Sequence, residues 1–489
     1  MSAAQGSAIG GRLARRLCGR SRAIVALVAA LAMGGCAVGP KYERPAVELP
    51  TEYPEVAAAI QTGAALRADW WKLYGDPQLD TLVATALERN ADLQLAAAQI
   101  DEARAALREA GSALLPEIDL NGTSNRTRVS QSTTVPTPSG VPVVRTDHRF
   151  AFATNFELDF WGKFRNATDA ARARLLSTQF GRDVVQLTLE STVAQAYFTL
   201  RSLDAQIAVT NQTIASREQS VTIVNARVQA GYSSDLDLSQ ARLLRANAAA
   251  QLRDLTRQRA LVQHQLEQFT GRLDLRVAVQ GALDLTLPAL PPPGLPSTLL
   301  ERRPDVIVAE QNLIAANAQI GVARAAQFPT FSLTGFLGGE SESLSSLLNA
   351  PGRIWSVGLG LAFPVLDSGR YAARTEQAEA RQRQAVAQYR KSVETAFKDV
   401  ADALANVRET IAAETDLRAA VEAARRAQQI AELRYTGGYA AYLEVLDAQR
   451  NANDAELALV RNRQQQLNYT VDFIRAIGGG WERSPPPLG

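Results

Sequence analysis

The sequence predicts an α+β membrane protein in which long helical hairpins alternate with pairs of short strands. Three observations support this fold class: the second half of the chain repeats the first, long stretches lack glycine and proline, and two segments alternate apolar with other residues. Runs free of glycine and proline favour helices, whereas alternation with a period of two is typical of strands. Aromatic residues make up only 6% of the chain, which favours long helices packed through small side chains over several ordinary globular cores.

The first residues have the features of an export signal. Five arginines precede an apolar run, Ala23–Met33, which ends directly before Gly34, Gly35 and Cys36. The run is about half as long as the roughly 20 residues that a membrane-spanning helix needs. Small residues before a cysteine resemble the lipobox of bacterial lipoproteins, in which the cysteine becomes the acylated first residue. We therefore expect residues 1–35 to be a cleaved signal peptide and Cys36 to carry a covalent lipid.

The expected location is the bacterial outer membrane, with a lipid anchor and a body that extends into the periplasm. Ala37 stands where bacterial sorting rules place Asp for retention in the inner membrane. The alternative is a secreted soluble protein that is cleaved nearby, with Cys36 as a spare thiol. Cys18 lies inside the signal, so we expect a mature chain with one cysteine and no internal disulfide.

Charge and composition argue against several function classes. The whole chain has a formal charge of +2, and loss of a signal with five arginines and no acidic residue would leave −3. Nucleic-acid binding normally needs a clustered positive charge, so no nucleic-acid partner is expected. His148 and His264 fall in different segments, and no glycine-rich phosphate loop is present. We therefore expect neither an enzyme nor a metal site, and no cofactor except the lipid on Cys36.

Self-comparison of the sequence reveals a tandem duplication. Residues 227–232 (RVQAGY) match 434–439 (RYTGGY) at an offset of 207, and Leu115-Pro116 matches Phe328-Pro329 at an offset of 213. Self-similarity at a nearly fixed spacing indicates repeated structural units. We expect six parts: a signal peptide (1–35), a lipidated N-terminal arm (36–78), a first repeat (79–287), a Pro-rich linker (288–297), a second repeat (298–480) and a C-terminal tail (481–489).

Each repeat is expected to contain one long helical hairpin. The four helices are predicted at 166–230, 232–270, 371–436 and 439–477. Only Gly181 interrupts the first of them, and the others contain no glycine or proline. At about 1.5 Å per residue, the longer helix of each hairpin would be roughly 100 Å long. Gly231 and Gly438 mark the turns of the two hairpins.

Four strands are expected as two pairs, near 117–129, 149–160, 330–337 and 354–363. The segments between the strands of each pair, around 130–146 and 338–352, are rich in Ser, Thr, Pro and Gly and are expected to be exposed loops. Two strands place mainly apolar residues on one face: Phe150, Phe152, Thr154, Phe156, Leu158 and Phe160 in one, and Trp355, Val357, Leu359, Leu361 and Phe363 in the other. This pattern indicates a membrane barrel, and the alternative is a soluble antiparallel sheet that buries this face. Four strands cannot close a barrel, so several chains must pool their strands.

The whole mature chain resembles the outer-membrane factor family of TolC-like channels, and in particular its lipidated OprM/NodT branch of RND-type efflux outer-membrane lipoproteins. The segments that carry the resemblance are 36–45 (CAVGPKYERP), 70–76 (WWKLYGD), 300–305 (LERRPD) and 442–450 (YLEVLDAQR). The resemblance implies a homotrimer. Its twelve strands, four per chain, would form one outer-membrane β-barrel, continued into the periplasm by a helical α-barrel tunnel.

The resemblance also implies a function, namely the exit duct of a tripartite efflux system in contact with outer-membrane lipids. Such a duct is a passive conduit coupled to a periplasmic adaptor (membrane fusion) protein and an inner-membrane transporter of RND type. Drugs or other small molecules are the expected cargo, and a type I secretion duct is an alternative. Rivals of another class are a periplasmic adaptor or a coiled-coil scaffold lipoprotein. An adaptor needs one hairpin and no barrel strands, whereas this chain has two hairpins and four strands.

The family closes the periplasmic end of its tunnel with acidic residues and a bulky apolar residue around the axis. The positions that match this gate are Leu443, Glu444 and Asp447, and the positions that match its linking groups are Asp237, Tyr435 and Arg450. Ala440 stands where some relatives have a linking arginine, so Arg450 is the expected substitute. The resemblance also implies that the adaptor contacts the hairpin tips at Gly231 and Gly438.

Overall fold

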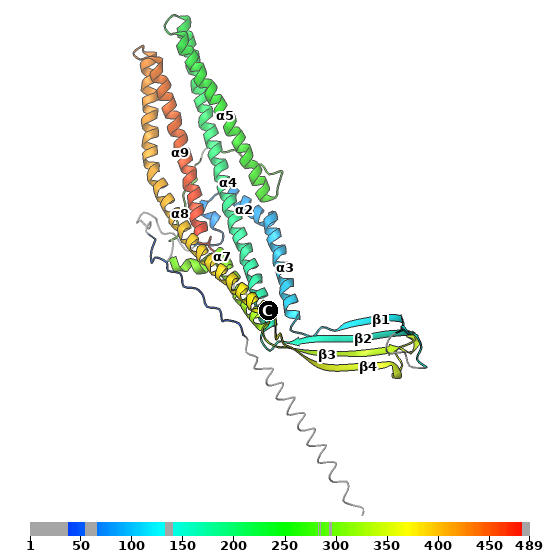
Figure 1. Cartoon of the computed structure of the whole chain (residues 1–489). Coiled ribbons are helices and arrows are strands. Elements are labelled where there is room, and N and C mark those ends of the chain that lie inside the picture. Colours follow the sequence, from blue (N-terminus) through cyan, green and yellow to red (C-terminus); the bar gives the residue numbers. More distant parts are fainter. Residues whose placement is uncertain are drawn as a thin grey trace, which may run out of the picture. The chain divides into compact units, whose positions relative to one another are not determined.

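Two long helical hairpins and a four-stranded antiparallel sheet dominate the structure. The computed structural model describes residues 38–53, 66–132, 140–281, 283, 285–292 and 296–481. The predicted signal peptide, Cys36 and tail residues 482–489 therefore lie outside the described residues. In chain order the elements are η1 (Trp70–Tyr74), α2 (Pro77–Arg89), α3 (Ala91–Ser112), β1 (Asp119–Arg128), β2 (Val144–Leu158), α4 (Lys163–Gln229), α5 (Asp235–Thr270), η2 (Pro296–Thr298), α6 (Leu299–Arg302), α7 (Pro304–Ala325), β3 (Thr330–Ser341), η3 (Leu344–Ser346), η4 (Ala350–Gly352), β4 (Arg353–Ala362), α8 (Arg370–Thr436) and α9 (Tyr442–Ala476) (Figure 1).

The chain forms two compact units, and each unit takes segments from both predicted repeats. One unit falls within residues 1–45, 101–176 and 310–387 and contains the sheet. The other falls within 46–100, 177–309 and 388–489 and contains most of the two hairpins, whose long helices α4 and α8 begin in the first unit. The predicted combination of long hairpins with four strands is confirmed.

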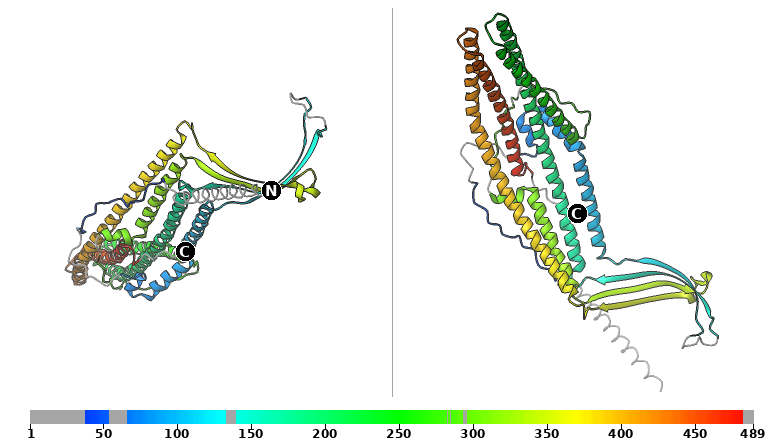
Figure 2. Two further views of the ribbon diagram at one scale, coloured as in Figure 1. Left: turned by 90° about the horizontal axis from the view of Figure 1, so that it is seen from below. Right: turned by 45° about the horizontal axis from the view of Figure 1, so that its top comes forward.

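The sheet has the strand order β1-β2-β3-β4, and every neighbouring pair is antiparallel. The right view in Figure 2 shows these strands side by side in one curved sheet. The register places Leu120 opposite Phe152, Phe152 opposite Leu337, and Leu337 opposite Trp355. The exposed fractions of these four side chains are 56%, 56%, 64% and 74%, respectively. One face of the sheet is therefore apolar and uncovered, as the alternation predicts.

β2 ends two residues earlier than predicted, because Asp159, the residue after the strand, caps the next helix. The carboxylate of Asp159 accepts the backbone N–H groups of Phe164 and Arg165 at 3.1 and 2.9 Å. This cap satisfies free N–H groups in the first turn of α4. Phe160, which we expected on the apolar face of the strand, lies in this connection instead.

The returning helices of both hairpins begin three residues later than predicted. In the first hairpin Ser234 is extended and accepts the N–H of Asp237, whose carboxylate accepts the N–H of Ser234 in return, so α5 has a complete capping box. In the second hairpin the equivalent cap position is Ala441, which has no side-chain acceptor. The two hairpins thus share a start position but differ in how that start is stabilised.

The segment 70–76 anchors the unit that contains the hairpins. Trp70 is fully buried in the main apolar cluster. Asp76 caps α2 and also accepts the hydroxyl of Tyr197 at 2.6 Å, while the buried guanidinium of Arg201 lies 3.3 Å from the same carboxylate. A buried charge needs such partners, because an unpaired one is strongly destabilising. This network ties η1 and α2 to α4.

The duplication reappears as equivalent contacts at the ends of the returning helices. Gly271 and Gly478 have φ of +64° and +99°. An added Cβ would lie 3.0 Å from the carbonyl oxygen of Arg89 at Gly271, and 2.3 Å from that of Arg302 at Gly478. Both positions therefore require glycine for backbone conformation and for close packing. Arg302 follows Arg89 by 213 residues, and Gly478 follows Gly271 by 207 residues. The same glycine–arginine contact therefore occurs once in each repeat.

We expect Gly478→Ala to destabilise the protein. The left-handed backbone alone costs an alanine about 1–2 kcal/mol, and the contact with Arg302 adds to this. The matched control is Gly181→Ala within α4, where no atom lies within 4 Å of the new methyl group; it should stabilise by about 0.5–1 kcal/mol. Thermal loss of the helical circular-dichroism signal measures both. Equal midpoints for the two variants would contradict the packing described here.

A second prediction concerns Glu190, which is buried and accepts hydrogen bonds from Trp70 Nε1 at 3.1 Å and Gln186 Nε2 at 2.9 Å. Burial raises the pKa of Glu190 to about 7, although both hydrogen bonds lower it. A raised carboxyl pKa means that the folded state holds its proton more tightly than the unfolded state. The contribution of protonated Glu190 to stability is therefore complete below the pKa that this carboxyl group has in the unfolded chain. It is lost as the pH rises to about 7.

Glu190→Gln should therefore flatten the fall in unfolding temperature between about pH 5 and pH 8. The control is Asp416→Asn, which changes an exposed carboxylate on α8 and should leave the slope as in the parent. A variant curve parallel to the parent curve would show that Glu190 does not titrate in this range.

Candidate functional site

Both hairpins turn through a glycine with the same geometry. Gly231 and Gly438 each have φ of +80°, a left-handed conformation that favours glycine. In each turn the N–H of the following tyrosine, Tyr232 or Tyr439, donates to the carbonyl group five residues earlier. This is a common way to end a long helix. The glycines predicted as adaptor contacts therefore lie at the ends of the two hairpins, and the adjacent tyrosines are exposed.

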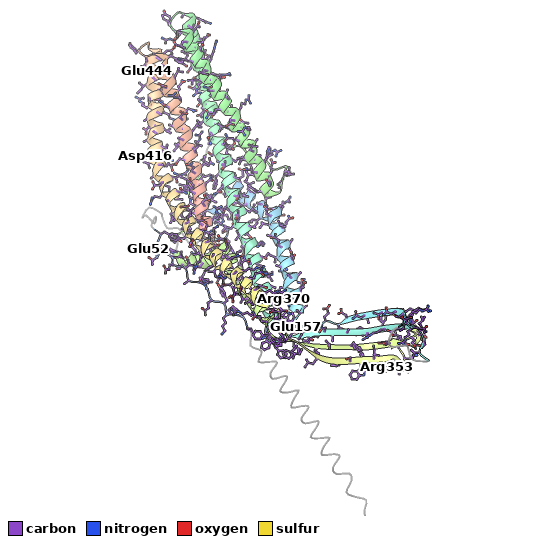
Figure 3. The ribbon with its side chains drawn as sticks, in the orientation of Figure 1. Glu52, Glu157, Arg353, Arg370, Asp416 and Glu444 are labelled. Atoms are coloured by element: carbon purple, nitrogen blue, oxygen red, sulfur yellow. The ribbon has the colours of Figure 1, made fainter. Side chains whose placement is uncertain are left out.

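The two hairpins pack against each other just behind these turns. The buried apolar cluster comes from α4, α5, α8 and α9 and consists of Val224, Leu238, Ala241, Ala431, Tyr435, Tyr442, Val445 and Leu446. Burial raises the pKa of Tyr442 to about 12, so its hydroxyl stays protonated. Figure 3 labels Glu444 beside this end of the α8–α9 hairpin.

Near the turns, Tyr435 joins the first hairpin to the second. Its hydroxyl lies 3.0 Å from the hydroxyl of Ser233, and its carbonyl oxygen accepts Nη1 of Arg227 at 3.0 Å. The guanidinium of Arg227 also lies 4.6 Å from the centre of the Tyr435 ring. Ser233 in turn donates to Asp237 at 3.2 Å. The structure thus connects the predicted linking residues Asp237 and Tyr435 through a serine that we did not predict.

The three predicted gate residues lie in the first two turns of α9. Leu443 is 60% exposed. Glu444 lies 3.4 Å from Arg434 of the same hairpin, and Asp447 lies 3.2 Å from Arg450 of the same helix. All four charged side chains are at least half exposed. Each of these pairs is therefore worth at most about 1 kcal/mol, because water screens it.

Arg450, predicted as a linking group in place of the arginine absent at Ala440, pairs with the gate carboxylate of Asp447 in its own helix. Sequence reasoning missed Arg227 and Arg434. Both stand at the same position of the repeat, four residues before the turn glycine. A basic residue repeated next to a turn could have indicated them. The duplication does not reveal that one arginine crosses to the other hairpin and that the other remains in its own.

Among the described residues, no group of three or more His, Cys, Asp or Glu side chains could hold a metal ion. No described helix combines the length and the hydropathy needed to cross a membrane.

Comparisons with known proteins agree on the family. The family model described as outer membrane efflux protein matches residues 82–272 and 295–479. This family consists of outer-membrane channels rather than enzymes. The chain is 35% identical over 463 residues to the outer membrane protein OprJ of Pseudomonas aeruginosa. The aligned region covers 94% of this chain and 96% of that protein.

Two further similarities extend over nearly the whole chain. The solvent efflux pump outer membrane protein SrpC of Pseudomonas putida is 33% identical, with 94% of this chain and 98% of that protein covered. Among solved structures, the CmeC outer membrane channel of Campylobacter jejuni has a TM-score of 0.86 at 26% identity, with coverage of 92% and 96%. The chain therefore belongs to the outer membrane efflux protein family and serves as an outer-membrane channel for efflux.

Proposed function

We propose that three copies of the chain form one continuous duct through the outer membrane and into the periplasm. The observation that carries this proposal is the uncovered apolar face of a sheet whose edge strands β1 and β4 each have one unpaired side. In a bilayer an unpaired strand edge is strongly unfavourable, and closure of the sheet removes it. Three sheets of four strands would supply a twelve-stranded barrel, within the size range of such barrels.

The other face of the sheet suits a water-filled lumen. Asn121 pairs with Ala151, and Ala151 pairs with Gly338 in the next strand. Small and polar residues on one face and apolar residues on the other are the pattern of a membrane barrel. The strands contain 10 to 15 residues, enough for the roughly 9–11 residues that cross a bilayer at a tilt.

The duct would act in a tripartite efflux system with a periplasmic adaptor and an RND-type inner-membrane transporter. Support comes from relatives named as efflux pump outer membrane proteins. The chain would contribute no catalysis and would pass drugs or other small molecules that the pump selects. A type I secretion duct has no observation in its favour here.

The N-terminal arm supports lipid attachment at Cys36. The N–H of Val38, two residues after Cys36, donates to the carbonyl oxygen of Trp161 at 3.3 Å. Trp161 follows the end of β2 by three residues. The described arm therefore contacts the chain close to the end of a strand that would cross the membrane, two residues after the proposed lipid attachment in the sequence. An acyl chain at this position would reach the bilayer directly, and a single chain adds only a marginal anchor to that of the barrel.

The gate would consist of Leu443, Glu444 and Asp447 from each of three chains, with six carboxylates around the axis. Crowded carboxylates attract cations and repel anions. The pairs Glu444–Arg434 and Asp447–Arg450 are exposed and weak, so they would hold the closed state without locking it. Tyr435, Arg227, Ser233 and Asp237 would keep the two hairpins together.

The adaptor would bind at the hairpin tips. A groove of about 440 Å³ lies behind them between α4 and the second hairpin. Its apolar lining includes Ile223, Val224, Leu433 and Val445. Such a groove accepts the apolar face of a partner helix.

The gate proposal predicts that Asp447→Ala and Glu444→Ala raise single-channel conductance several-fold and weaken cation selectivity. Removal of a carboxylate lowers the negative potential at the axis and frees its arginine. Asp416→Ala is the matched control, because it removes an exposed carboxylate of α8 distant from the turn (Figure 3). Planar-bilayer recordings and the trimer mass in the same detergent provide the measurement. A folded monomer without conductance would contradict the duct itself.

The adaptor proposal predicts a cross-link between the tips and a periplasmic protein in cells. Tyr232→Cys and Tyr439→Cys, each labelled with a benzophenone maleimide, should capture the adaptor after illumination, because both side chains are exposed beside the turn glycines. Asp416→Cys should capture none. Mass spectrometry identifies the product, and equal capture at all three positions would refute docking at the tips.

A further inference from the structure

A basic hollow lies in the unit that contains the sheet. It has a volume of about 540 Å³ and is lined by residues of α4, α7 and α8. Its cationic lining residues are Lys163, Arg174, Arg374 and Arg381. Three amides, five alanines and a valine complete the lining, and no acidic residue is among the described residues that line it. The hollow therefore combines a cationic rim with a small, largely apolar floor.

The charges around the hollow leave it positive. Lys163 is paired with Glu157 at 3.0 Å, so this cation is partly neutralised. Arg374 lies 5.5 Å from the ring of Tyr371, and this contact does not neutralise the guanidinium charge. Arg381 is exposed. Arginines in such a hollow can bind a carboxylate, sulfonate or phosphate with two parallel hydrogen bonds.

The hollow is centred on α7, which packs between α4 and α8. An added Cβ on Gly321 of α7 would lie 2.5 Å from the side chain of Asn166 in α4. On the other side, Arg324 lies 2.7 Å from Glu379 of α8. The hollow thus lies in the middle of this helical layer and not at an edge where a neighbouring chain would join.

The N-terminal arm packs on the opposite face of α7. Pro40 accepts a hydrogen bond from Asn317 at 2.9 Å, and Arg44 binds Glu310 at 2.7 Å. At 3.6 residues per turn, Glu310 and Asn317 share one face of the helix. Gln319, which lines the hollow, is about half a turn away from both.

The position of the arm identifies the inner face of the helical layer. An arm that leads to a lipid anchor must run outside the duct, because the bilayer surrounds the barrel and the lumen holds water. The hollow on the opposite face of α7 therefore opens into the lumen. This step rests on the proposed trimeric duct and its lipid anchor.

We propose that the hollow is a lumenal binding site for amphiphilic organic anions with a long apolar chain and one carboxylate or sulfonate. The arginines bind the anionic group, and the alanine and valine floor accepts the chain. Three copies would place nine such arginines around the lumen. The site attracts anions at one level of the duct, whereas the acidic gate at the hairpin tips repels them.

The test uses the whole trimer in nanodiscs of phosphatidylcholine and the fluorescent probe 11-(dansylamino)undecanoic acid. The probe should bind the parent protein and bind Arg374→Gln/Arg381→Gln about tenfold more weakly, as expected for the loss of charge-assisted hydrogen bonds. Arg383→Gln is the matched control. It removes an exposed arginine two residues from Arg381 on the same helix and should bind the probe like the parent.

Further arms of the experiment distinguish the alternatives. The methyl ester of the probe has the same chain without the charge and should bind weakly to all variants. Nanodiscs with phosphatidylglycerol should leave probe binding unchanged, because lipid headgroups do not reach the lumen. Competition by phosphatidylglycerol would overturn the lumenal site in favour of a lipid site. Equal probe affinity in the parent and the double variant would overturn the anion site.

Failure of the duct and failure of the anion site give different results. Trimer mass and bilayer conductance test the duct without the probe. A conducting trimer whose probe affinity is unaffected by Arg374→Gln/Arg381→Gln would retain the proposed function and refute the binding site.

Discussion

The pairing of backbone N–H and C=O groups in a lipid environment is the constraint on which the structure depends. Water can satisfy an unpaired strand edge, whereas hydrocarbon cannot. The sheet has an uncovered apolar face and two edge strands, so a single chain leaves this constraint unmet. Insertion of the sheet into the membrane therefore requires assembly with other chains, because only their strands can pair its edges.

The sequence allowed the regular parts of the fold to be predicted and failed where side chains or glycines set a boundary. The two hairpins were predictable because glycine and proline are absent from the helices and present at the turns. β3, in contrast, continues through Gly338 and Gly339 to Ser341, where we expected a loop. At Gly338 an added Cβ would lie 2.0 Å from the carbonyl oxygen of Phe150, so glycine here serves close strand packing and not a turn.

The tip of the molecule shows a different limit of sequence reasoning. The duplication identifies Arg227 and Arg434 as equivalent residues, yet Arg227 binds Tyr435 of the other hairpin whereas Arg434 pairs with Glu444 of its own. Duplication preserves a position in the helix, but the packing of two hairpins against each other gives the copies different neighbours. The roles of these two arginines therefore depend on tertiary contacts, which cannot be predicted from sequence periodicity or spacing.

The different caps of the two returning helices have a mechanical consequence. α5 begins with the reciprocal hydrogen bonds of Ser234 and Asp237, whereas α9 begins after Ala441 without a side-chain acceptor. Such a cap is typically worth about 1 kcal/mol, so the first turn of α9 unwinds more easily than that of α5. Leu443 and Glu444 lie in that first turn. The hairpin with the less stable cap is thus the one that carries the proposed gate residues, and the hairpin with the complete capping box resists unwinding more strongly.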